Sequence, residues 1–82
     1  MYSLIYTSRA RRDIKRLDII VQKRLKKSLE YFRERPLYYA EKLQDRALGN
    51  YRFRVGNYRV IFDLDNHDIV ILRVGHRREI YR

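Results

Sequence analysis

Three arginines flank a turn in the last third of the chain, at spacings that bring their side chains onto one surface. Arg52 and Arg54 precede Gly56-Asn57, and Arg59 follows it. Because side chains alternate between the two faces of a strand, Arg52 and Arg54 share a face. The guanidinium group is planar, keeps its charge and can hold two phosphate oxygens at once. The spacing therefore predicts a site for an anionic, phosphate-bearing ligand.

The turn determines how the two flanking strands pair. Gly56-Asn57 is a two-residue turn whose residues tolerate positive φ, which is typical of a β-hairpin. It predicts the pairs Tyr51 with Phe62, Phe53 with Val60, Arg54 with Arg59 and Val55 with Tyr58. One face is then aromatic and aliphatic, and the other carries the arginines. Like charges directly opposite each other destabilise a sheet by up to about 1 kcal/mol. The arginine face is thus either a binding site for an anion or the solvated face of a very basic protein.

A further strand is expected at residues 69–76. Strict alternation predicts one face with Arg73, Gly75 and Arg77 and the other with Val70, Leu72 and Val74. The third strand would therefore add to both the basic and the apolar face of the hairpin.

Composition limits the classes of protein and partner. The 82 residues are enough for one domain, 1–82, and 20 Lys and Arg against 10 Asp and Glu give a net charge of +10. Such a charge points to nucleic acid, an acidic protein or an anionic membrane. Membrane is disfavoured because the longest apolar run, Ile69 to Leu72, is far too short to span. The absence of cysteine fits the cytoplasm, and with two histidines we expect no metal site and no cofactor.

The remaining elements predict an α+β fold. A strand at residues 2–6 precedes a short helix, 9–17, with Thr7 or Ser8 as its N-cap, and Asp18 caps a longer helix that ends near residue 33, before Pro36. Residues 35–50 are expected to form a loop with one helical turn. The order β-α-α-β-β-β predicts a small, twisted, mostly antiparallel sheet with a two-helix hairpin packed on one face and the arginines on the open face. The first strand joins at an edge or in parallel.

Three segments resemble the RelE/ParE superfamily of toxins from type II toxin–antitoxin modules. They are Arg52-Phe-Arg-Val-Gly-Asn-Tyr-Arg59, then Val74-Gly-His-Arg77, and Ile80-Tyr81 near the end. The resemblance covers nearly the whole chain. It implies a RelE-type mRNA endonuclease (mRNA interferase) that acts in the ribosomal A site, inhibits translation and is neutralised by an antitoxin. The catalytic set that it implies is Arg52, Arg54, Arg59, Arg77 and Tyr81.

These residue types fit a metal-independent cleavage in which the RNA 2′-OH attacks its own phosphodiester. The reaction needs a base, charge stabilisation at phosphorus and an acid for the leaving 5′-oxygen. Arg59 is the expected phosphate clamp, with Arg54 and Arg77 beside it. Tyr81 is the expected base, because neighbouring cations favour a phenolate. Arg77 would protonate or neutralise the leaving oxygen, and His76 is an alternative acid.

A second set of residues is expected to contact RNA without doing chemistry. It comprises Arg73, His76, Lys23, Lys26 and Lys27. The three lysines fall on the helix before residue 33, where they either form a solvated face or bind ribosomal RNA backbone in a salt-dependent way.

Two other functions share much of this pattern. A ParE-like toxin would poison DNA gyrase without nuclease activity, and a non-catalytic module would bind RNA or DNA through the same basic face. In the toxin interpretations we expect a monomeric toxin domain with an acidic, partly disordered antitoxin that folds on binding. The ribosome and mRNA are further partners only if the chain is a nuclease.

Overall fold

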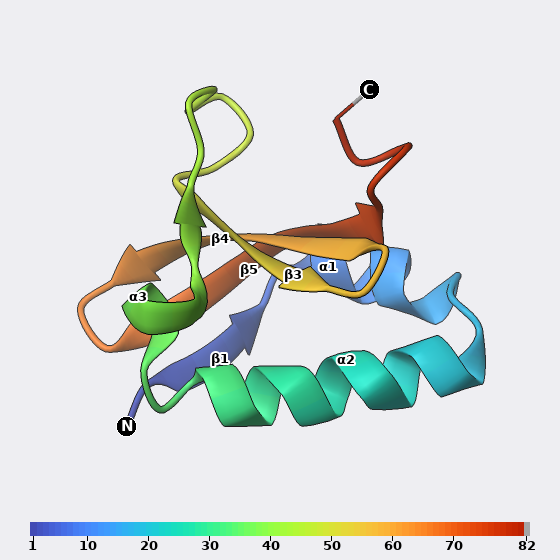
Figure 1. The fold of residues 1–82 in the computed structure, drawn as a ribbon, viewed down its shortest axis with the longest axis horizontal. Helices are drawn as coiled ribbons and strands as arrows, with labels where there is room; N and C mark the ends of the chain where they lie inside the picture. The colour runs from blue at the N-terminus through green and yellow to red at the C-terminus, as the bar shows by residue number, and fades with distance from the viewer. Residues whose placement is uncertain (82) are drawn as a thin grey trace.

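The computed structural model describes residues 1–81, which form a five-stranded sheet and three helices. The elements are β1 (Ser3–Tyr6), α1 (Ser8–Lys15), α2 (Ile19–Phe32), α3 (Pro36–Tyr39), β2 (Glu41–Lys42), β3 (Tyr51–Val55), β4 (Tyr58–Asp65) and β5 (Asp68–His76). The sheet order is β1-β5-β4-β3-β2, and β1 is parallel to β5 while the other pairs are antiparallel. Helices α1 and α2 lie on one face, and the 43–50 loop and the C-terminal segment rise from the other (Figure 1). The predicted α+β fold is confirmed.

The helices begin where hydroxyl and carboxyl side chains cap them. The Thr7 hydroxyl accepts the Ala10 N–H at 3.2 Å, and the Asp18 carboxylate accepts the Ile20 N–H at 2.9 Å. Both predicted caps are confirmed, with Thr7 rather than Ser8 in the first role. None of the helices in residues 1–81 is long and apolar enough to cross a membrane.

The stretch between α2 and β3 differs from the prediction of a loop with one helical turn. The expected helical turn is present as α3. Pro36 stands at its first position, where proline costs nothing because the N–H of that residue would have no partner within the helix. Helix α2 ends before it, at Phe32. The short strand β2 then pairs with β3, placing Glu41 opposite Arg52. A two-residue strand has no periodicity to read, so the sequence did not indicate it.

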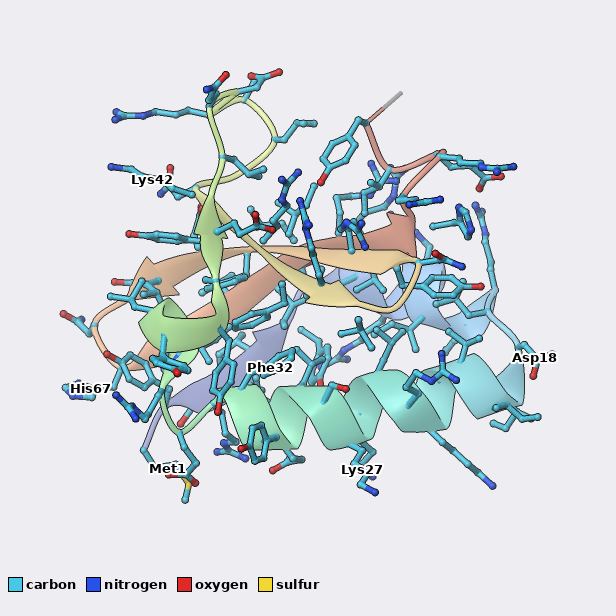
Figure 2. The ribbon with its side chains drawn as sticks, viewed as in Figure 1. Met1, Asp18, Lys27, Phe32, Lys42 and His67 are labelled. Atoms are coloured by element: carbon cyan, nitrogen blue, oxygen red, sulfur yellow. The ribbon has the colours of Figure 1, made fainter. Side chains whose placement is uncertain are left out.

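The predicted hairpin register is confirmed at every pair. Phe53 lies opposite Val60, and Arg54 opposite Arg59. The Phe53 and Phe62 rings stack with centroids 4.2 Å apart, and both side chains are fully buried. On the helix side they meet Leu25 and Leu29 of α2 within one core cluster. Phe32 points from α2 toward the sheet, whereas Lys27 points away from it (Figure 2).

Strict alternation along β5 was wrong for part of the strand. Ile71 pairs with Phe62, and Arg73 pairs with the adjacent Ile61, so the ladder shifts by one residue at Leu72. A β-bulge of this kind adds one residue to one strand and reverses the facing of the residues beyond it. Ile69 and Ile71 therefore join Val74 in the core, and Val70 and Leu72 do not.

The face opposite the helices is covered in part rather than fully open. Gly49, in the loop before β3, is buried against Ile61 and Leu72, at φ +151°. A Cβ at this glycine would lie 2.6 Å from Ile61 Cγ2, so only glycine permits this approach. At the other end, Ile80 packs over Gly75 and is 2% exposed. The loop and the C-terminal turn therefore both pack on the arginine-bearing face.

Candidate phosphate-binding site

Arginines from β3, from β4 and from the end of β5 gather on the face opposite the helices. We call Arg52, Arg54, Arg59 and Arg77 the arginine cluster. Arg54 lies directly opposite Arg59 in the hairpin. The other three arginines are all close enough for their charges to act on the guanidinium of Arg59. The structure therefore places the four guanidinium groups near one another, and their joint role in binding phosphate stays a prediction.

Arg59 is the most enclosed member of the cluster. It is 9% exposed, and its Nη1 donates to the carbonyl oxygens of Gly56 and Tyr58, each at 2.9 Å. Burial lowers the pKa of Arg59 from its ordinary value, and the positive charge of Arg54 lowers it further. A guanidinium titrates so far above neutrality that it stays charged. The hairpin thus holds a fixed cation whose remaining N–H groups are free of protein partners among residues 1–81.

Arg52 joins the sheet to the C-terminal turn. Its Nη1 donates to the Tyr81 hydroxyl oxygen at 2.8 Å, and its Nε donates to Glu41 Oε1 at 3.3 Å. The hydrogen bond to Tyr81 raises the pKa of Arg52, Glu41 adds to this, and burial acts against both. Arg54 also pairs with Glu41 Oε1, with its Nε at 2.6 Å. The basic surface therefore contains a carboxylate and a phenol in addition to its guanidinium groups.

The C-terminal turn is held in place by backbone bonds and one buried side chain. The Arg77 N–H donates to Asn57 O at 2.8 Å, which ties the end of β5 to the hairpin turn. The Ile80 N–H donates to His76 O at 3.0 Å, and the Ile80 side chain is buried. With these contacts fixed, the next residue, Tyr81, lies against Arg52 although it is 40% exposed.

Arg73 and His76, both predicted to contact RNA, engage other groups. Arg73 Nε donates to Asp13 Oδ2 of α1 at 2.9 Å. His76 lies opposite Tyr58, edge-to-face with its ring at 5.4 Å between centroids, and its Nδ1 accepts the Arg78 N–H at 3.2 Å. Tyr58 also packs against the apolar core on the helix side. Neither side chain is therefore directed into the arginine cluster.

The three lysines predicted to bind RNA backbone also lie apart from the cluster. Lys23, Lys26 and Lys27 are exposed on α2, in the helical layer on the opposite side of the sheet (Figure 1). Lys23 and Lys26 line a groove between α2 and β1. Any contact that they make with RNA would be separate from the cluster.

Asp13 is a buried carboxylate that the sequence did not single out. It is 7% exposed, and its Oδ2 accepts both the Val74 N–H at 3.0 Å and Arg73 Nε. Burial alone would raise the pKa of Asp13, but these hydrogen bonds and the charge of Arg73 outweigh it and leave the pKa below its ordinary value. Strand β1 pairs with β5 only as far as Ile71. Beyond that point Asp13, in place of a strand, accepts the hydrogen bond of the Val74 N–H. Its role is to fasten α1 to β5.

Glu41 is the second residue that the sequence interpretation missed. Its oxygen is shared by two members of the cluster, and it comes from the strand that was predicted as loop. No metal-binding group of three or more His, Cys, Asp or Glu side chains occurs within residues 1–81.

The fold as a whole matches solved structures of RelE toxins. Over residues 4–81 the sequence matches the family described as ParE toxin of type II toxin-antitoxin system, parDE, and the chain belongs to this family, within the RelE/ParE superfamily. The predicted family resemblance is thereby confirmed.

Individual relatives agree with the family assignment. The sequence is 32% identical to Toxin RelG of Mycobacterium tuberculosis, over 99% of this chain and 97% of the relative. The fold is similar to the M. tuberculosis toxin–antitoxin complex RelBE2, with a TM-score of 0.83, 29% identity and 93% and 98% of the two chains covered. It is also similar to the RelB–RelE complex of Methanococcus jannaschii, with a TM-score of 0.73, 26% identity and 94% of each chain covered.

Proposed function

We propose that this toxin is a ribosome-dependent mRNA endonuclease that inhibits translation. The observation that carries the proposal is the arginine cluster, with Arg59 fixed at its base and Tyr81 hydrogen-bonded to Arg52 at 2.8 Å. Preorganised cations aimed at a phosphate stabilise the charge that develops during phosphodiester cleavage. The similarity to Toxin RelG and to RelE structures supports the same interpretation.

The chemistry assigns a role to each group. The RNA 2′-oxygen attacks phosphorus as Tyr81, in its phenolate form, accepts the 2′-OH proton, and the bond to the 5′-oxygen breaks. The products are a 2′,3′-cyclic phosphate and a 5′-hydroxyl. Arg59 and Arg54 bind the non-bridging oxygens, since a guanidinium holds phosphate oxygens in a planar fork. Arg77 acts as the acid: it gives a proton to the leaving 5′-oxygen, which becomes the 5′-hydroxyl, and regains one from solvent. The edge-to-face contact of His76 with Tyr58 makes the histidine the weaker candidate for this acid role.

The arginine cluster consists of guanidinium groups, which hold their protons too firmly to serve as efficient general acids or bases, so its capacity for catalysis on free RNA is limited. Positioning can supply the missing rate, because holding reacting groups in alignment lowers a barrier by about 7–11 kcal/mol. The ribosome would provide that alignment by presenting mRNA to the arginine cluster. This explains why we propose a ribosome-dependent enzyme rather than a general ribonuclease.

An acidic antitoxin is the proposed protein partner. The similar structures named above are toxin–antitoxin complexes. In this chain a groove of about 720 Å³ runs between α2 and β1, with apolar residues that include Leu4, Leu25 and Leu29 and with Lys23 and Lys26 among its basic residues. Such a groove suits an amphipathic acidic segment that folds on binding. The toxin should then co-purify with a small acidic protein encoded beside it, and Lys23→Glu with Lys26→Glu should weaken that complex.

Inhibition of DNA gyrase is the second candidate, because the matching family is described by its ParE toxins. Purified toxin added to a translating extract separates the two functions. Cleavage of mRNA within codons, mapped by primer extension and reduced in Arg59→Met, is the expected result. Intact mRNA together with loss of gyrase supercoiling would replace the proposal with the second candidate. Intact mRNA with normal supercoiling would contradict both.

A further inference from the structure

Glu41 places one carboxylate oxygen between two members of the arginine cluster. Its Oε1 lies 2.6 Å from Arg54 Nε and 3.3 Å from Arg52 Nε. The contact depends on β2, which sets Glu41 directly opposite Arg52. Because Arg52 and Arg54 are two residues apart on one strand, a single oxygen opposite them reaches both.

The contact has the chemistry of a bound phosphate oxygen. Guanidinium groups form charge-assisted hydrogen bonds with carboxylate and phosphate oxygens alike, so a phosphate oxygen could accept the same two bonds. The Glu41 side chain is 44% exposed and Arg54 is 56% exposed, so solvent and ligands can reach the pair. Exposed ion pairs are weak and exchange readily for another anion. A phosphate could therefore replace this carboxylate without rearrangement of the fold.

No other carboxylate in the described part of the chain pairs with the cluster. Asp13 is engaged by Arg73 and by the Val74 N–H. Asp63 accepts the Asn50 N–H at 2.7 Å and so holds the loop that precedes β3. Among residues 1–81, Glu41 is the one internal counter-charge of the arginine cluster.

We infer that Glu41 occupies the position of an RNA phosphate oxygen in the free protein and is displaced when RNA binds. It is a positioning residue that keeps Arg52 and Arg54 together against their repulsion and also competes with the ligand. The identity of the ligand as RNA rests on the proposed function. The competition itself requires only an anionic ligand at the cluster.

The test measures binding of a short single-stranded 2′-O-methyl RNA, which cannot be cleaved because it lacks the attacking hydroxyl. Fluorescence anisotropy compares the wild type with Glu41→Gln and with a matched control, Glu34→Gln. Glu34 is exposed, lies between α2 and α3 and has no ion pair within residues 1–81. Both variants raise the net charge by the same amount. Because Glu41→Gln loses the ion pairs with Arg52 and Arg54, it should bind the RNA analogue about three- to tenfold more tightly than the wild type.

A second readout follows the Nε–Hε signals of Arg52 and Arg54 by NMR. In the wild type these signals should move on addition of the RNA analogue. In free Glu41→Gln they should already differ from the wild type. Equal affinities of Glu41→Gln and Glu34→Gln, or wild-type signals that do not respond to the bound analogue, would overturn the inference. Tighter binding by Glu41→Gln while wild-type toxin leaves mRNA intact in the extract would retain the inference for an anionic ligand and reject the nuclease.

Discussion

Replacing Arg59 by methionine separates a role in binding phosphate from a role in holding the fold. The change removes two hydrogen bonds from the charged Nη1 to carbonyl oxygens, worth about 3–6 kcal/mol together. It also removes the repulsion from Arg54 directly opposite, worth up to about 1 kcal/mol, and the desolvation cost of a charge that is 9% exposed, on the order of several kcal/mol. These contributions oppose each other, so we expect the free energy of unfolding to change by less than about 1 kcal/mol.

The effect on activity should be far larger than the effect on stability. Loss of one preorganised charge-stabilising donor typically lowers a rate by about 10²- to 10³-fold. Urea unfolding followed by circular dichroism gives the stability, and cleavage of a reporter mRNA in a translating extract gives the rate. Arg11→Met is the matched control, because Arg11 is exposed on α1, in the layer opposite the cluster.

Two results would refute this reasoning. If Arg59→Met lowers the free energy of unfolding by more than about 2 kcal/mol, the arginine mainly holds the hairpin turn and lost activity reflects lost fold. If the variant cuts mRNA at a rate close to that of Arg11→Met, the arginine is not the phosphate clamp. The expected pattern, inactive yet stable, is typical of a residue retained for function.

Three further changes test other parts of the structure. Asp13→Ala should lower the free energy of unfolding by about 2–4 kcal/mol, since it leaves a buried N–H and a guanidinium without their acceptor. The pKa of Asp13 in the folded protein is below its ordinary 3.8, so its carboxylate stabilises the fold in full above that pH. This stabilisation is lost as the pH falls through the folded pKa. In Asp13→Asn the free energy of unfolding should therefore depend less on pH near and below pH 4. Tyr81→Phe should lower mRNA cleavage by about 10²- to 10⁴-fold with unfolding unchanged, and cleavage equal to that of the control Tyr38→Phe would remove Tyr81 from the mechanism. Gly49→Ala should cost about 1–3 kcal/mol or more through overlap with Ile61, whereas Gly56→Ala, whose Cβ would meet only the flexible end of Arg24 at 3.4 Å, should cost about 1 kcal/mol; equal losses in thermal unfolding would contradict the packing argument.

The hairpin shows how much of the site could be predicted from sequence. Alternation and the Gly56-Asn57 turn predicted the pairing of β3 with β4, including Arg54 opposite Arg59. Both signals are local, because a two-residue turn leaves one register that buries every apolar side chain on the same face. The positions of the arginines followed from that register.

The missed features depend on contacts between distant segments. The bulge at Leu72 inserts one residue into a strand that begins with four consecutive apolar residues, Ile69 to Leu72, so no break in the polar pattern marks it. The packed Leu72 then contacts Gly49 from the loop before β3. Nothing within residues 69–76 encodes that contact. Strand β2 is equally invisible, because two residues carry no period and only pairing with β3 makes them a strand.

The counter-charge and the phenol reach the cluster from these less predictable segments. Glu41 arrives on β2, and Tyr81 arrives on the turn that Ile80 anchors over Gly75. The strands β3 to β5 and their ends therefore supply the cations, whereas β2 and the C-terminal turn supply the carboxylate and the phenol that pair with them. A substitution that loosens β2 or the C-terminal turn should change binding and chemistry while the core of Phe53 and Phe62 stays intact, because neither segment contributes to that stack. We therefore expect substitutions in β2 or the C-terminal turn to change the proposed activity with little effect on the free energy of unfolding.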